Sequence, residues 1–182
     1  GQPEAEPGLQ LEAGAADYDS WNAGVVGTGP LVTDQLLYRL AVNRFHSDGF
    51  IKNDYLGRDD TNGQDETTVR GKLRWLPTGR DTLDLTLMYI DIDNGYDAFS
   101  LDNTRHTLSD EPGKDRQDSR ALGLEWQREL DAMTVETSVT AATTASTYSF
   151  DEDWSYVGIA PGWEYSSKDR YKRDRDSYSA TA

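Results

Sequence analysis

The chain has 182 residues, no cysteine, 33 acidic against 18 basic residues and a formal net charge of -15, and 36% of its residues are hydrophobic. The absence of cysteine excludes a disulfide framework and thiolate chemistry. The acid excess argues against a nucleic-acid partner, because phosphate binding needs a basic surface. No stretch reaches the roughly 18 consecutive apolar residues of a membrane-spanning helix. Transmembrane strands need only about 9 to 11 residues of alternating character, so this composition still permits a transmembrane barrel.

Apolar residues recur at every second position over most of the chain, which predicts half-buried strands. The alternation is clearest where Leu83, Leu85 and Leu87 interleave with Asp84 and Thr86. Successive side chains of a strand point to opposite faces, so one face of such a strand avoids water and the other seeks it. In chain order, the expected strands cover residues 8–16, 20–28, 35–46, 67–75, 82–91, 118–129, 133–147 and a segment from about 171 to the end.

The connections between these strands alternate in length from the third strand onward. Long loops at 47–66, 92–117 and 148–170 are separated by two short connections, PTGRD and Leu130–Ala132. A soluble antiparallel sandwich would show the same side-chain alternation, but loops of this length are uncommon in compact soluble domains. Short turns on one side and long loops on the other are typical of outer-membrane barrels. We therefore expect an all-β fold, an antiparallel transmembrane β-barrel portion of about eight strands, with a soluble sandwich as the alternative.

This layout also places the aromatic residues of the strands. With the long loops outside the cell, Trp75 and Trp126 fall toward the periplasmic interface, and Trp21, Tyr89 and Tyr148 fall toward the outer one. Transmembrane barrels carry girdles of aromatic side chains at these two levels. The alternative is that the same residues pack in the core of a sandwich.

The stretch VRGKLRW places three cations on one face of the fourth expected strand. Arg70, Lys72 and Arg74 share one parity, and the other parity is apolar, with Val69, Leu73 and Trp75. In a barrel we expect the apolar set to meet lipid and the cations to line the interior together with Glu125. Acids on neighbouring strands, such as Asp84 or Glu125, are the expected partners of the cations if the strand register allows it.

No catalytic constellation is visible in the sequence. The two histidines, His46 and His106, belong to no spaced metal or triad motif. Paired acids such as Asp59 and Asp60 occur in loop sequence, where runs of charge are ordinarily solvated. We therefore expect no catalytic residues, no enzyme activity and no cofactor.

The segment DIDNGYD is a calcium candidate, because Asp91, Asp93 and Asp97 supply hard oxygen ligands within a short stretch. It departs from the EF-hand pattern, since Gly95 stands where that loop has a ligand and no glutamate closes it. A hydrated hairpin tip is the alternative interpretation.

Aromatic residues in two long loops suggest a ligand site. Aromatic faces and scattered cations suit flat, anionic, metal-bound chelates through stacking and cation–π attraction. The alternative is that these side chains only order the loops or belong to the upper girdle. The candidate ligand-binding residues are Tyr96, Phe99, Phe150, Trp154, Tyr156, Trp163 and Tyr165.

An ordered series of segments resembles the β-barrel domain of TonB-dependent outer-membrane receptors, over nearly the whole chain. The segments are YRLAVNRFHSDGFIKN (38–53), GRDDTN (57–62), RGKLRWLP (70–77), YIDIDNGYDAFSLDN (89–103), SDEPGKDRQDS (109–119) and YSFDEDW (148–154). The resemblance implies the outer membrane of a Gram-negative bacterium and the active uptake of a scarce nutrient, with a ferric siderophore as the expected cargo. It also implies capture by the outer loops, followed by movement of a plug domain that the TonB complex pulls.

Family members enclose this plug in a barrel of about 22 strands. Residues 1–182 contain neither a plug nor the short box that contacts the energy-transducing protein, so the resemblance implies a partial barrel domain without the plug and the remaining strands. Outer-membrane lipid and, through the plug, the TonB complex are the implied partners. The alternatives are a receptor for another cargo, such as cobalamin or an oligosaccharide, and a small structural or adhesive barrel that does not transport.

Overall fold

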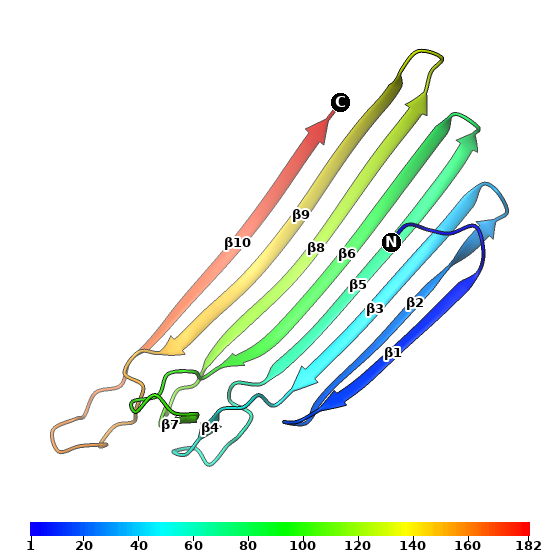
Figure 1. Cartoon of the computed structure of the whole chain (residues 1–182). Coiled ribbons are helices and arrows are strands. Elements are labelled where there is room, and N and C mark those ends of the chain that lie inside the picture. Colours follow the sequence, from blue (N-terminus) through cyan, green and yellow to red (C-terminus); the bar gives the residue numbers. More distant parts are fainter.

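The computed structural model describes residues 1–182 and consists of one large antiparallel sheet of eight strands that neighbour one another in chain order (Figure 1). A separate parallel pair joins two of the loops, β4 (Lys52–Asn53) and β7 (His106–Thr107). No helix is present that could cross a membrane. The strands of the large sheet are β1 (Gly8–Ala16), β2 (Ser20–Val32), β3 (Leu36–Ser47), β5 (Gln64–Thr78), β6 (Asp81–Tyr96), β8 (Gly113–Glu129), β9 (Thr134–Asp151) and β10 (Lys168–Thr181).

The prediction of an all-β chain with an eight-stranded antiparallel sheet is confirmed, but the sheet is not closed, and β1 and β10 form its two edges. The predicted strands were too short at the end where the long loops lie. For example, β6 continues to Tyr96, which pairs with Gly113 at the start of β8. The β8 residues that pair with this extension, Gly113 to Gln117, include no apolar side chain on either face, so the backbone ladder continues where the alternation of side chains has ended.

The register of the sheet aligns side chains of one parity into apolar rows. We call this side the apolar face. One row holds Leu36, Trp75, Leu83 and Trp126, and the next holds Tyr38, Leu73, Leu85, Leu124 and Val139. A further row crosses the whole sheet through Leu9, Gly27, Leu40, Gly71, Leu87, Leu122, Ala141 and Tyr178.

The boundary of the apolar face toward the loops runs obliquely across the strands. On β2 the apolar residues continue as far as Trp21, which pairs with His46, whereas on β3 they end at Val42. On β10 they already end at Tyr178, in the same row as Leu40. The boundary therefore lies progressively farther from the loops from β2 to β10.

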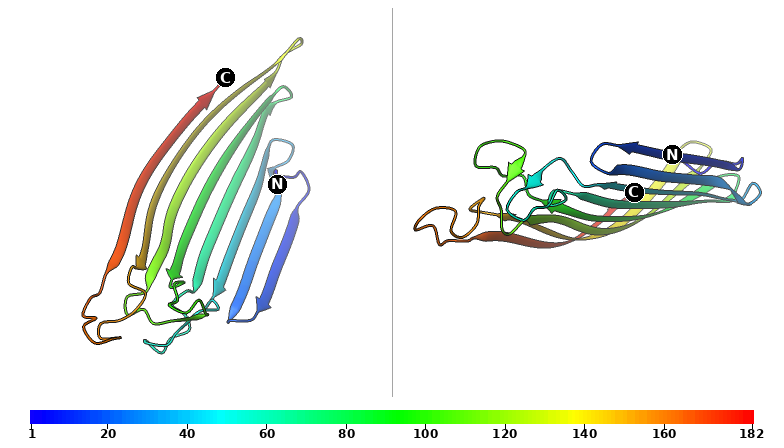
Figure 2. Two further views of the ribbon diagram at one scale, coloured as in Figure 1. Left: turned by 60° about the vertical axis from the view of Figure 1, so that its left-hand side comes forward. Right: turned by 90° about the horizontal axis from the view of Figure 1, so that it is seen from below.

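Almost no apolar side chain is buried within the protein. Leu37 and Ile51 are the only large ones that are fully buried, whereas Trp75, Leu87 and Leu124 are 50%, 48% and 43% exposed. The sheet is a single curved layer, and β1 and β2 rise out of the plane of the other strands (Figure 2). The apolar face has no second protein layer against it.

The opposite side, which we call the polar face, carries the predicted cations. Arg74 pairs in register with Asp84 and makes a bidentate ion pair with it, Nε to Oδ1 at 2.8 Å and Nη2 to Oδ2 at 2.6 Å. Glu125 lies opposite Asp84 on β8. Arg70 Nη2 donates to the sulfur of Met88 at 3.6 Å and forms no ion pair. The expected pairing with Asp84 is therefore confirmed for Arg74 and not found for Arg70.

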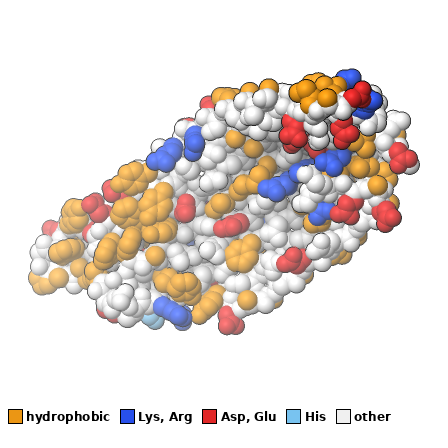
Figure 3. Space-filling view, turned by 45° about the horizontal axis from the view of Figure 1, so that its top comes forward, with side chains coloured by type: hydrophobic (Ala, Val, Ile, Leu, Met, Phe, Trp, Pro, Cys, Tyr) orange, Lys and Arg blue, Asp and Glu red, His pale blue; other side chains and the backbone are white.

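The N-terminal segment, residues 1–7, lies across the polar face. Lys72 Nζ donates to Gln2 Oε1 at 3.2 Å, and Arg39 pairs with Glu4 at 3.4 Å. The backbone N–H of Glu4 donates to Thr28 Oγ1 at 3.0 Å. Lys and Arg side chains gather in the hollow of this face (Figure 3). Two of the predicted cations thus have polar contacts but no carboxylate within salt-bridge distance.

The Arg74 pair predicts a measurable contribution to stability. Asp84→Ala leaves a guanidinium that is only 26% exposed without its bidentate partner. Hydrogen bonds to charged groups contribute about 1.5 to 3 kcal/mol, and water screens this partly exposed pair, so we expect a loss of about 2 kcal/mol in the free energy of unfolding, measured by urea unfolding with tryptophan fluorescence. Glu136→Ala, an exposed acid with no partner, is the matched control and should change it by less than about 0.5 kcal/mol.

Candidate ligand-binding site

The long connections at one end of the sheet are joined to one another. Lys52 N–H donates to the carbonyl of Arg105 at 2.9 Å, and Asp54 N–H donates to that of Thr107 at 2.9 Å, so the β4–β7 pair links the segments 48–63 and 97–112. The third loop, 152–167, joins them through the N–H of Asp110, which donates to Ser155 O at 3.0 Å. The loops form one assembly that the sequence did not predict.

Asp97 is the polar anchor of this assembly. Its side chain is 4% exposed, and its Oδ2 accepts hydrogen bonds from Asn53 Nδ2 at 2.8 Å and Thr107 Oγ1 at 2.9 Å. Asn53 Nδ2 also donates to the carbonyl of Ser109 at 2.8 Å, and its Oδ1 accepts from Leu56 N–H at 2.8 Å. A buried carboxylate is tolerated here because hydrogen-bond donors from two loops surround it.

The structure does not bring the calcium candidates together. Asp91 and Asp93 lie on the same side of β6 as the apolar residues, whereas Asp97 follows the strand and is buried among Asn53 and Thr107. Asp93 forms an ion pair with Arg116. No group of three or more histidine or acidic side chains is arranged to hold a metal ion.

An aromatic cluster lies where β6, β9 and β10 meet the loops. We define it as Tyr96, Phe99, Tyr148, Phe150, Trp154 and Tyr171. Phe99 stacks on Trp154, with ring centroids 4.9 Å apart and an interplanar angle of 7°, and meets Phe150 edge-on at 5.7 Å. Tyr96 contacts Tyr148 at 4.9 Å. Hydrophobic side chains gather at this end of the molecule in Figure 3. The cluster offers several ring edges and faces to a flat ligand.

The backbone of Trp154 is held in an uncommon conformation. Its φ is 58°, in the left-handed region that residues other than glycine seldom adopt. Asp151 is 5% exposed, and its Oδ1 accepts hydrogen bonds from the N–H groups of Asp153 and Trp154, both at 3.1 Å. Asp151 therefore fixes the turn that presents the Trp154 ring to Phe99.

The structure separates the predicted ligand residues into two sets. It brings Tyr96, Phe99, Phe150 and Trp154 together in the aromatic cluster. The others lie elsewhere: Tyr156 stacks on Tyr55 at 4.3 Å, and Trp163 and Tyr165 are exposed in the third loop, 45% and 53% respectively.

Two members of the cluster were missed by the sequence analysis. The placement of Tyr148 in the outer girdle was wrong, because its parity on β9 puts it on the polar side, where it contacts Tyr96 and Tyr171. The signal was present in the sequence, since Tyr148 and Phe150 are two residues apart on one strand and must share a face. Tyr171 could be found only from the register that pairs it with Tyr148.

Charges near the aromatic cluster are arranged by depth. Tyr171 OH donates to Asp169 at 3.2 Å, and Asp115 pairs in register with Tyr148. On the opposite side from the loops, Arg173 and Arg175 follow Tyr171 at the same parity on β10, and no carboxylate lies within salt-bridge distance of either. The aromatic rings thus lie between acids at the loop end and free cations deeper in the hollow.

Two loop carboxyls, those of Asp60 and Asp102, have a pKa below the ordinary value. Hydrogen bonds from Arg58, at 2.7 and 2.9 Å, hold the pKa of Asp60 below its ordinary value. Hydrogen bonds from the hydroxyls of Ser100 and Thr104 likewise lower the pKa of Asp102. Both carboxylates belong to the loops that form the assembly.

No protein-family model, curated protein or solved structure matches the chain. Function is therefore inferred from the geometry of the site and from the two faces of the sheet. The arrangement can bind a ligand through aromatic stacking and through cations.

The role of Asp97 can be tested by removing its side chain. Asp97→Ala leaves the buried donors of Asn53 and Thr107 without an acceptor, which should cost about 1 to 3 kcal/mol of local stability. We expect faster amide hydrogen exchange in the segments 48–63 and 97–112, with the central strands unchanged. Asp102→Ala is the control, because Asp102 bonds only within its own turn. Equal exchange in both variants would contradict the anchoring role.

Proposed function

We propose that this chain forms part of the wall of a transmembrane β-barrel in the outer membrane of a Gram-negative bacterium. The observation that carries the proposal is the apolar face, which spans all eight strands and is covered by no other part of the protein. In water such a face would be unfavourable by roughly 25 cal/mol for each Å² of apolar surface. Lipid covers it without a second protein layer, and the polar face then lines the interior.

The oblique boundary of the apolar face supports the same proposal. Strands of a barrel tilt by about 35 to 45° from the barrel axis, so a membrane surface crosses successive strands at steadily shifting positions. The boundary shifts in this way from Trp21 on β2, past Val42 on β3, to Tyr178 on β10. A soluble sandwich places no such demand on its apolar face, and it would need a second sheet against these rows.

The open edges favour a portion of a larger barrel over a small closed one. The strands β1 and β10 leave backbone groups without partners, which lipid cannot satisfy. Further strands would satisfy them. A small structural or adhesive barrel is the second candidate. The hydrogen bonds that join the loops to one another favour it, because they order the surface that the loops display.

Within this class we propose a TonB-dependent receptor whose loop end captures a ferric siderophore. The stacked pair Phe99 and Trp154 suits a flat aromatic chelate, and the free Arg173 and Arg175 suit its negative charge. The N-terminal segment lies on the polar face, where a barrel has its interior. Uptake would require the plug and the TonB complex. Cobalamin or an oligosaccharide are the alternative cargoes.

The lipid-facing assignment predicts a pattern of thiol labelling. Cysteines replacing Leu85 or Leu124 should be shielded from a water-soluble thiol reagent when the protein is in membranes, since both lie on the apolar face. Cysteines replacing Asp59 or Glu164, which are exposed in the loops, should be labelled on intact cells. Strong labelling at position 85 in membranes would refute the proposal.

Ligand capture by the aromatic cluster predicts an effect of Trp154→Ala on affinity. Loss of the ring stacked on Phe99 should weaken binding of an aromatic ferric chelate about tenfold, since such ring contacts contribute about 0.5 to 1.5 kcal/mol beyond the area they bury. Titration of the protein with ferric catecholates, cobalamin and oligosaccharides, followed by fluorescence quenching or calorimetry, measures this. Trp163→Ala, outside the cluster, is the matched control. An equal loss of affinity in Trp154→Ala and Trp163→Ala would contradict a site at the aromatic cluster.

A further inference from the structure

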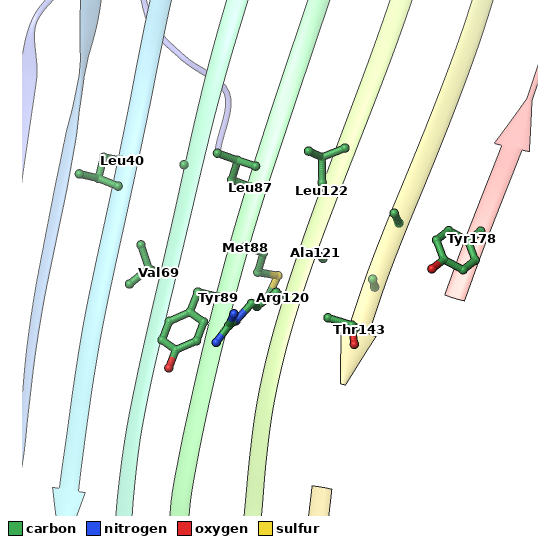
Figure 4. A pocket seen from close by; sticks show the side chains of 13 residues that line it. Leu40, Val69, Leu87, Met88, Tyr89, Arg120, Ala121, Leu122, Thr143 and Tyr178 are labelled. Atoms are coloured by element: carbon green, nitrogen blue, oxygen red, sulfur yellow. The ribbon is translucent and has the colours of Figure 1, made fainter. Parts of the chain in front are cut away.

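A second group of exposed aromatic side chains, together with a cation, lies at the loop end and outside the aromatic cluster. It consists of Tyr18, Phe50 and Arg105, and we call it the turn patch. The hollow on the apolar face (Figure 4) belongs to the surface that the proposed function assigns to lipid, whereas the turn patch faces water at the end of the sheet. Tyr18 and Phe50 are 52% and 51% exposed. Neighbouring exposed rings, unlike single ones, indicate an interaction surface.

The three side chains of the turn patch contact one another. Arg105 Cζ lies 5.3 Å from the centre of the Phe50 ring, and Arg105 Nη1 donates to Tyr18 Oη at 3.4 Å. The ring centroids of Tyr18 and Phe50 are 6.4 Å apart, at an interplanar angle of 60°. Arg105 forms no ion pair, so its guanidinium is positioned on an aromatic face and keeps further donors free for a ligand.

The backbone that presents Phe50 is fixed on both sides. Gly49 has a φ of 81°, and a Cβ at this position would collide with the carbonyl oxygen of Asn62, so the chain needs glycine there. On the other side, the N–H of Lys52 donates to the carbonyl of Arg105 at 2.9 Å. Phe50 and Arg105 are therefore held by backbone segments that are bonded to each other.

The turn between β1 and β2 holds Tyr18 in a backbone conformation that does not suit a bulky residue. Tyr18 and Asp19 have φ values of 64° and 49°. Turns with positive φ at two successive positions prefer Asn and Gly, and a large side chain is uncommon there. The N–H of Asp48 donates to the carbonyl of Tyr18 at 2.9 Å and ties the turn to the first loop. An exposed ring kept at a strained position is a combination found at functional sites.

We propose that the turn patch binds a neutral saccharide. The two rings pack against the C–H groups of a sugar, and Arg105 donates to its hydroxyl groups. Carboxylate acceptors for the hydroxyl protons flank Tyr18, since Asp19 follows it and Asp48 is bonded to its carbonyl. These carboxylates disfavour an anionic ligand and Arg105 disfavours a cationic one, so the charges select a neutral, hydroxyl-rich molecule. The inference does not rest on the proposed function, because the patch lies outside the apolar face.

Isothermal titration calorimetry of the purified protein in detergent micelles tests the site. The probes are neutral hexasaccharides of glucose, mannose and galactose, and a hexamer of galacturonic acid is the acidic counterpart of the galactose chain. We expect binding of a neutral hexasaccharide and weaker binding of the galacturonic acid hexamer. Phe50→Ala should weaken the binding about tenfold, because one of the two rings is lost. Arg105→Gln should also weaken it, since the guanidinium donors are lost.

Tyr18→Gly separates binding from folding. Glycine suits the left-handed backbone, so the midpoint of urea unfolding should not fall, whereas the affinity for the saccharide should fall about tenfold. Tyr165→Ala is the matched control, because it removes a ring of similar exposure, 53%, from the third loop and should leave the affinity unchanged. Unchanged affinity in Tyr18→Gly, or no binding of any neutral hexasaccharide, would overturn the site. Tighter binding of the galacturonic acid hexamer would overturn the assigned class of ligand.

Discussion

The whole structure depends on one constraint, the two-sidedness of a single-layer sheet. Side chains of a strand alternate between its faces, so a sheet of eight strands with an apolar parity exposes that parity over its full area unless something covers it. Here only Leu37 and Ile51 are buried as large apolar residues. The hydrogen-bond ladder holds neighbouring strands together, but the environment of the apolar face must supply what a protein core supplies elsewhere.

On the polar face, the constraint is repulsion between like charges. Its cations stand close together on β3 and β5, and repulsion among them has to be offset. Asp84 does so for Arg74 within the sheet, whereas Arg39 and Lys72 use Glu4 and Gln2 of the N-terminal segment. The N-terminal segment thus contributes one ion pair and one hydrogen bond to the cations of this face.

The sequence predicted this sheet well because parity is a local property. The alternation of Leu83, Leu85 and Leu87 with Asp84 can be recognised without any knowledge of neighbouring strands. The pairing of Arg74 with Asp84 could be predicted because a short turn joins their two strands and sets the register. The extension of β6 to Tyr96 could not be predicted in the same way, because the partners there are polar on both faces and only the backbone ladder identifies the strand.

The candidate site was less predictable, because it depends on contacts between residues far apart in the chain. No local sequence pattern predicts the buried network that joins Asn53, Asp97 and Thr107. The β4–β7 pair joins residues separated by more than fifty positions. Composition alone identified aromatic loops, but it could not separate Phe99 and Trp154, which stack, from Trp163, which does not. Loop folds are determined by such long-range partners.

The stretch VRGKLRW places cations on the polar face of β5 and apolar side chains on its apolar face. On the polar face, the register decides which of its cations is paired, and only Arg74 meets an acid. On the apolar face, Val69, Leu73 and Trp75 supply bulk, and Gly71 between them supplies none, so the same parity that predicts a uniform surface leaves a groove at one position. Alternation therefore sorts the faces, whereas cross-strand register decides where either face can recognise a particular molecule.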